Sequence, residues 1–157
     1  MKKRINWKIL ALSFLVVLLV AAAGSLFASS KRNTEWYQSI KPEITPPNYI
    51  FPLVWNILFT LIAISLYIAW TSSSPKQKNK LILFFGINLA LNLVWSIIFF
   101  TLKNPALAFA ELILFWLSII YILIITYKIN KISAYLLVPY LLWVTFAGYL
   151  NYLIVFQ

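Results

Sequence analysis

Five apolar runs of about 20 residues each occupy most of this 157-residue chain. A run of this length crosses roughly 30 Å of hydrocarbon as an α-helix that rises about 1.5 Å per residue. Strands of a membrane barrel would alternate apolar and polar residues over about ten positions, and these runs do not. The sequence therefore predicts one all-α domain over residues 1–157, a bundle of five transmembrane helices at residues 5–27, 51–70, 81–102, 107–127 and 132–156.

The composition supports a membrane protein and excludes several functions. Hydrophobic residues make up 63% of the chain and charged residues 10%, whereas soluble domains contain about 45–50% apolar and 25% charged residues. The net charge of +10 is dispersed among the connections, so we expect membrane lipid, and no nucleic acid, as the partner of these cations. With no Cys and no His, we expect no disulfide, no thiol nucleophile and no metal site.

The first run has an alternative interpretation as a cleavable signal peptide. Cations at positions 2–4 precede it, and small residues at positions 28–30 follow it, as in secretory leaders. However, the run is longer than the usual apolar core of about 7–15 residues. We therefore favour an uncleaved first helix.

The connections between the runs differ in length. The first, residues 28–50, is long and contains Pro42, Pro46 and Pro47, while the others are short. Proline fixes φ and keeps the preceding residue extended, so part of this connection should be stiff. The short connections favour an up-and-down bundle, and the first connection is the segment long enough to form a lid.

The distribution of cations predicts the orientation, because cytoplasmic loops are enriched in Lys and Arg. Nine lie on the side of the N-terminus and four on the opposite side. In a plasma membrane the N-terminus would therefore be cytoplasmic and the lid would face outward. The nine are Lys2, Lys3, Arg4, Lys8, Lys76, Lys78, Lys80, Lys128 and Lys131, and the four are Lys31, Arg32, Lys41 and Lys103.

Three of the predicted helices carry aromatic and amide side chains at helical spacing, so that each set lies on one face. Three such stripes could enclose a flat hydrophobic molecule, with indole N–H groups and asparagine amides as the polar contacts. The alternative is that the aromatic residues only pack and that the asparagines join helices. The stripes are Phe51, Trp55 and Phe59; Asn88, Asn92, Trp95 and Phe99; and Pro139, Trp143, Ala147 and Asn151.

Two further features of the apolar runs have open interpretations. Glu111 is the acidic residue within a span, and it is either a ligand or proton site or an interfacial partner for a neighbouring helix. Gly86 and Ala90 form a small-xxx-small pair, which allows two membrane helices to approach closely. Because Asn88 lies about 200° around the helix from Gly86, we expect Gly86 and Ala90 to form an outer contact in a homodimer.

The order of several short motifs along the five runs resembles the tryptophan-rich sensory protein family, the bacterial and archaeal branch of the translocator proteins, whose mitochondrial members were called peripheral-type benzodiazepine receptors. The resemblance extends from about residue 5 to the end. It rests on Trp36-Tyr37, Lys41-Pro42, Thr45-Pro46-Pro47, Phe51, Trp55, Asn88, Asn92, Trp95, Pro105, Glu111, the segment Pro139 to Trp143, and Asn151.

The resemblance implies a five-helix bundle, usually dimeric, with a cavity beneath the first connection that accepts porphyrins and synthetic aromatic ligands. Many relatives have tyrosine at the position of Phe59, so this chain lacks one polar group on the cavity wall. Carried onto this sequence, the implied ligand-binding residues are Trp36, Pro47, Trp55, Phe59, Asn88, Trp143 and Ala147, to which the stripe adds Asn92.

The resemblance further suggests a membrane receptor for porphyrin-like tetrapyrroles with a role in stress or tetrapyrrole regulation. No cofactor is required. The chain lacks His and Cys, and its one Met is Met1, so metal-free porphyrin is the expected ligand. One alternative is a light-dependent porphyrin-degrading enzyme that uses Trp55 and Trp143, and another is a passive transporter of lipophilic ligands.

Overall fold

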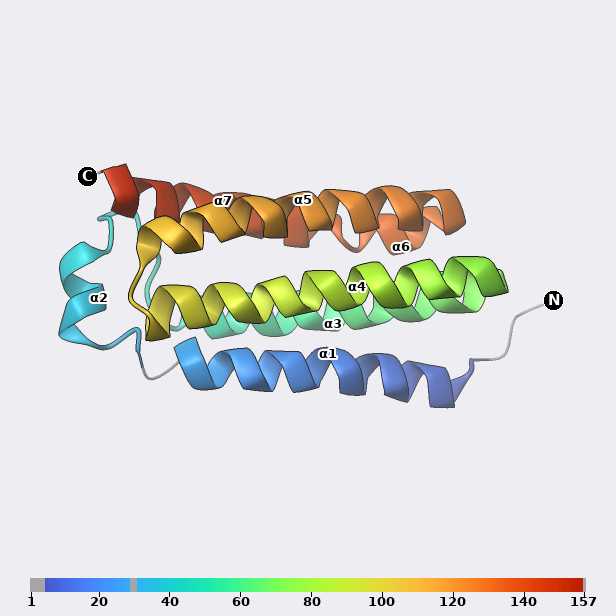
Figure 1. The fold of residues 1–157 in the computed structure, drawn as a ribbon. Coiled ribbons are helices and arrows are strands. Elements are labelled where there is room, and N and C mark those ends of the chain that lie inside the picture. The colour runs from blue at the N-terminus through green and yellow to red at the C-terminus, as the bar shows by residue number, and fades with distance from the viewer. Residues whose placement is uncertain (1–4, 29–30, 157) are drawn as a thin grey trace.

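A computed structural model describes residues 5–28 and 31–156 and shows an up-and-down bundle of five long helices (Figure 1). All five are long and apolar enough to cross a membrane, and the described residues contain no strand. The predicted all-α, five-helix membrane fold is therefore confirmed. Its elements are α1 (Trp7–Ala28), α2 (Glu35–Ile40), α3 (Ile50–Ser72), α4 (Pro75–Ser96), the π-helix η1 (Ile97–Thr101), α5 (Pro105–Ile129), α6 (Lys131–Tyr135) and α7 (Val138–Phe156).

Helix α4 begins at Pro75, six residues before the predicted start at residue 81. The first turn is polar, so hydropathy alone does not detect it. The Ser74 backbone N–H donates to Oε1 of Gln77 over 2.8 Å, and proline suits the first helical turn because its missing N–H would have no partner there. Polar capping therefore extends this helix beyond its apolar run.

The fifth predicted run forms two helices, α6 and α7, separated by a turn at residues 136–137. Pro139 explains the break, because a proline within a helix removes one backbone hydrogen bond and its ring clashes with the carbonyl four residues earlier. The predicted lid at residues 28–50 is not irregular throughout, because it contains the short helix α2.

The end of the bundle formed by α6 is solidly packed. The side-chain hydroxyl of Ser65 in α3 donates to the backbone carbonyl of Ser133 over 2.8 Å, and the hydroxyl of Ser133 donates to the carbonyl of Ser65 over the same distance. Both residues are fully buried. Reciprocal bonds of this kind satisfy polar groups that lipid cannot solvate, and they fix α3 against α6.

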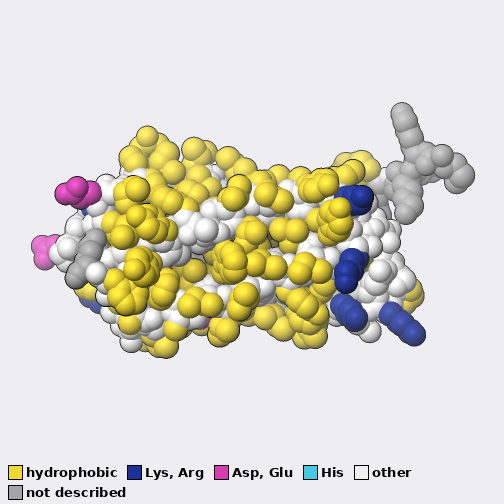
Figure 2. Space-filling view, turned by 90° about the horizontal axis from the view of Figure 1, so that it is seen from above, with side chains coloured by type: hydrophobic (Ala, Val, Ile, Leu, Met, Phe, Trp, Pro, Cys, Tyr) yellow, Lys and Arg dark blue, Asp and Glu magenta, His cyan; other side chains and the backbone are white. Residues whose placement is uncertain are grey.

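The surface of the bundle is apolar along its length and charged at its ends. Figure 2 shows a broad hydrophobic band, with most of the visible Lys and Arg at the end where the chain begins and exposed acidic side chains at the other end. Large side chains such as Leu19 and Leu142 point outward, with 61% and 65% of their surface exposed. An apolar surface of this kind is expected of a helix bundle surrounded by lipid.

Candidate ligand cavity

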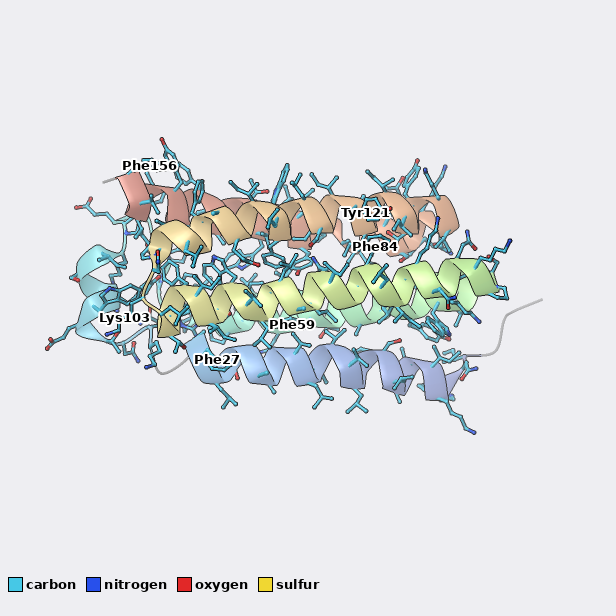
Figure 3. The ribbon with its side chains drawn as sticks, in the orientation of Figure 1. Phe27, Phe59, Phe84, Lys103, Tyr121 and Phe156 are labelled. Atoms are coloured by element: carbon cyan, nitrogen blue, oxygen red, sulfur yellow. The ribbon has the colours of Figure 1, made fainter. Side chains whose placement is uncertain are left out.

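A cavity of about 570 Å³ lies inside the bundle at the end covered by α2. Side chains from α1, α3, α4, η1, α5 and α7 form its walls, and Tyr37 of α2 closes part of the end. Figure 3 shows Phe59 in the interior of the bundle, while Lys103 lies at the end beside α2. The volume falls within the range of roughly 300–1,000 Å³ that is typical of small-molecule sites.

The three predicted stripes converge on this cavity. Each contributes three lining side chains, and one aromatic contact joins two of the stripes. Trp55 stacks on Phe59 with ring centroids 5.2 Å apart, and Phe51 of α3 meets Trp143 of α7 edge to face at 5.9 Å. The lining residues from the stripes are Phe51, Trp55, Phe59, Asn92, Trp95, Phe99, Trp143, Ala147 and Asn151.

Two of the polar side chains in the wall are already hydrogen-bonded. The Trp95 indole N–H donates to Oδ1 of Asn151 over 3.3 Å, and the Asn151 amide donates to the carbonyl oxygen of Pro105 over 2.9 Å. In contrast, the hydrogen bonds among the described residues include none from the indole N–H of Trp55 or Trp143. Both residues line the cavity, and neither indole N–H is engaged by another described residue.

Asn88 lies one helical turn deeper than Asn92 and does not line the cavity. It is fully buried, its amide donates to the Ser118 hydroxyl over 2.8 Å, and its Oδ1 accepts from the Tyr140 hydroxyl over 3.1 Å. These bonds join α4, α5 and α7 below the cavity. Asn88 thus matches the alternative interpretation in which asparagine links helices, whereas Asn92 faces the cavity.

The two predicted lid residues also lie outside the lining. Trp36 packs against Phe99, with ring centroids 5.8 Å apart, and Pro47 is exposed. The residues of the predicted lid that do line the cavity include Arg32 and Tyr37. Tyr37 is 5% exposed and packs against Phe100, with ring centroids 5.8 Å apart. Burial raises the pKa of Tyr37, and nearby Arg32 partly offsets this effect.

Helix α1 supplies a wall that the sequence interpretation did not anticipate. It presents small side chains to the cavity, among them Ala21, Gly24 and Ser25. Ser25 of this wall and Asn56 of α3 both line the cavity, and both are exposed at the protein surface. The cavity therefore reaches the surface between α1 and α3. The cluster of small residues near the end of the first run is the sequence signal for this space.

Gly86 and Ala90 lie on the outer face of α4, and both are exposed. A Cβ atom added at Gly86 would meet no other atom within 4 Å.

Glu111 is buried within α5, and neither carboxylate oxygen has a hydrogen-bond partner among the described residues. The described residues also contain no group of three His, Cys, Asp or Glu side chains that could hold a metal ion.

Comparisons with known proteins find one family and several of its members that match almost the whole chain. The model of a family described as TspO/MBR matches residues 13–157. The tryptophan-rich protein TspO of Archaeoglobus fulgidus is 40% identical over 146 residues, covering 92% of this chain and 94% of that protein. The tryptophan-rich sensory protein of Cereibacter sphaeroides is 29% identical, covering 88% and 87% of the two chains. The translocator protein of Bos taurus is 31% identical, covering 86% and 83%.

Proposed function

The chain belongs to the TspO/MBR family, and from this membership we propose that it is a membrane receptor that binds porphyrin-like tetrapyrroles and other flat aromatic ligands. It is an integral membrane protein. The observation that carries the proposal is the meeting of Trp55, Trp95 and Trp143, from α3, α4 and α7, in the wall of one cavity. Indole rings supply large, rigid contact area for a planar guest.

The chemistry of the walls favours a guest that is mostly apolar. Aromatic and small apolar side chains dominate the lining, and Asn92 with the indole N–H groups of Trp55 and Trp143 provides a few polar contacts. A site of this composition orients a ligand through few hydrogen bonds and binds it mainly by burial. Because the chain lacks His and Cys, the usual axial donors to haem iron are missing, and metal-free porphyrin is the proposed ligand.

We expect the variant Ala147→Phe to weaken porphyrin binding at least tenfold, because the added ring would occupy space in the cavity. Purified protein in lipid nanodiscs is titrated with protoporphyrin IX, and binding is followed by the quenching of tryptophan fluorescence. The matched control is Ala110→Phe, the same change at an exposed position of α5. Quenching that does not saturate in the unmodified protein, or equal affinities for the two variants, would contradict the proposed function.

We also propose a regulatory role in stress or tetrapyrrole metabolism, with the protein in a plasma membrane and its N-terminus in the cytoplasm. The word "sensory" in the name of the Cereibacter relative supports the regulatory role. The proposed orientation rests on the excess of cations, among them Lys76 and Lys128, at the end where the chain begins. The cations at positions 2–4, which contribute to this excess, lie outside the described residues.

The open outer face at Gly86 supports a proposed homodimer. Small residues at an exposed position allow a second helix to approach closely, and we expect Gly86→Phe to convert the dimer into a monomer. The mass of the protein in detergent, determined by light scattering, measures this change, with Ala110→Phe as the control. A mass that is the same for the unmodified protein and for Gly86→Phe would argue against a dimer through this face.

A further inference from the structure

We infer that Arg32 makes the cavity selective for anionic guests, by binding a carboxylate on the rim of a flat and otherwise apolar molecule. This inference rests on the proposed function and specifies the class of ligand. It starts from the composition of the wall. Arg32 is the charged side chain among the described residues that line the cavity, and it lies at the end covered by α2.

Among residues 5–28 and 31–156, Arg32 has no acidic side chain as a partner. The chain contains three acidic residues, Glu35, Glu43 and Glu111. Glu35 and Glu43 are exposed, and the carboxylate of Glu111 has no hydrogen-bond partner. Consistent with this, burial is the main influence on the pKa of Arg32, which it lowers, and the opposing influence comes from Tyr37 and not from a carboxylate.

The guanidinium lies against the cavity wall, and the backbone that carries it is hydrogen-bonded. Its Cζ atom lies 5.7 Å from the centre of the Phe51 ring, within the range of a cation–π contact. The backbone on either side is held as well, because the Arg32 N–H donates to the carbonyl of Ala28 over 3.3 Å and the Arg32 carbonyl accepts from the Gln38 amide over 2.7 Å. The cation is therefore placed at the cavity in advance of any ligand.

A partly buried guanidinium without a counter-ion is a strong site for a carboxylate. Arginine binds carboxylate oxygens through two parallel N–H donors, and the bond replaces water that burial has removed. Beyond Arg32 the wall is aromatic, with Trp55, Phe59 and Phe115 at greater depth. The matching ligand has an aromatic body that enters first and an acidic group that remains at the lid. The propionate side chains of a porphyrin have this arrangement.

The test compares protoporphyrin IX, which has two free propionates, with its dimethyl ester, which has the same ring and no charge. We expect Arg32→Gln to weaken binding of the acid about tenfold and to leave binding of the ester unchanged. Arg32→Lys should restore part of the preference for the acid. The matched control is Lys31→Gln, which removes the same charge from the neighbouring residue, outside the cavity lining.

Several results would overturn this inference. Equal losses for acid and ester in Arg32→Gln would show a structural effect, and an equal loss of acid binding in Lys31→Gln would show an unspecific effect of charge. If the ester binds the unmodified protein in a saturable manner as tightly as the acid, the inference fails and the proposed function stands. If neither porphyrin binds in a saturable manner, both fail.

The headgroup of a lipid with net negative charge is a second source of anionic groups, and the choice of lipid distinguishes it. The titrations are made in nanodiscs of phosphatidylcholine and again with added phosphatidylglycerol. A preference for the acid that depends on Arg32 in phosphatidylcholine supports the ligand carboxylate as the partner. The absence of this preference in phosphatidylcholine, together with weaker binding of both porphyrins when phosphatidylglycerol is added, would identify the anionic lipid headgroup as the partner and overturn the inference.

Discussion

Replacing Trp143 by alanine should weaken porphyrin binding by ten- to a hundredfold, as is typical of a buried aromatic anchor worth about 1.5–3 kcal/mol. Trp143 lines the cavity and packs edge to face on Phe51 of α3. The substitution removes the largest surface that α7 offers to a guest. Because it also removes a fluorophore, binding is measured by the shift of the porphyrin absorption band.

The control for this prediction is Trp7→Ala. Trp7 is 69% exposed at the opposite end of the bundle, so its removal changes the tryptophan content without changing the cavity. We expect unaltered affinity in this variant. If Trp143→Ala binds as tightly as the unmodified protein, stacking on this indole contributes nothing and the ligand occupies another place.

Replacing Glu111 by leucine should stabilise the protein by roughly 1–3 kcal/mol, the range for removing an unsatisfied buried polar group. Glu111 is 8% exposed, and both of its carboxylate oxygens are buried without a hydrogen bond. Such a group is costly inside a membrane protein, and leucine has a similar size. The midpoint of thermal unfolding in detergent measures the effect.

Two further variants separate this explanation from a general effect of charge. Glu111→Gln retains a polar group without a partner and should gain less stability than Glu111→Leu. Glu35→Leu removes an exposed acid and should leave the midpoint unchanged. A lower midpoint in Glu111→Leu would show instead that the carboxylate contributes to folding. A gain in stability together with weaker porphyrin binding would indicate that the group is kept for function at the expense of stability.

The sequence was sufficient to predict the five membrane-spanning segments and much of the cavity wall. An α-helix places residues four apart on one face, so Trp55 and Phe59, or Trp143 and Ala147, could be grouped without knowledge of the tertiary structure. Periodicity does not give depth along the helix axis. The spacing of Asn88 and Asn92 does not distinguish them, because both lie on the same face of the helix. Only the structure shows that Asn88 lies below the cavity, hydrogen-bonded to residues of α5 and α7.

Features that depend on contacts between distant segments could not be predicted. Arg32 reaches the cavity because of how the connection after α1 folds over the bundle. In the sequence, its charge gave information only about the orientation of the protein in the membrane. The wall formed by Ala21 and Gly24 depends on the position of α1 beside α3 and α4. Apolar residues of one helix are alike in sequence whether they face lipid, a neighbouring helix or an empty space.

The paired serine bonds between Ser65 and Ser133 have a consequence for how a guest could come and go. They hold α3 and α6 together at the end of the bundle opposite α2, where the interior is filled. Because stability within a protein is distributed unevenly, the helix ends around the hollow can separate while the bonded end keeps the chain assembled. If the protein binds a ligand as proposed, exchange needs only a partial and reversible loosening of the bundle, and the molecule need not unfold to release its guest.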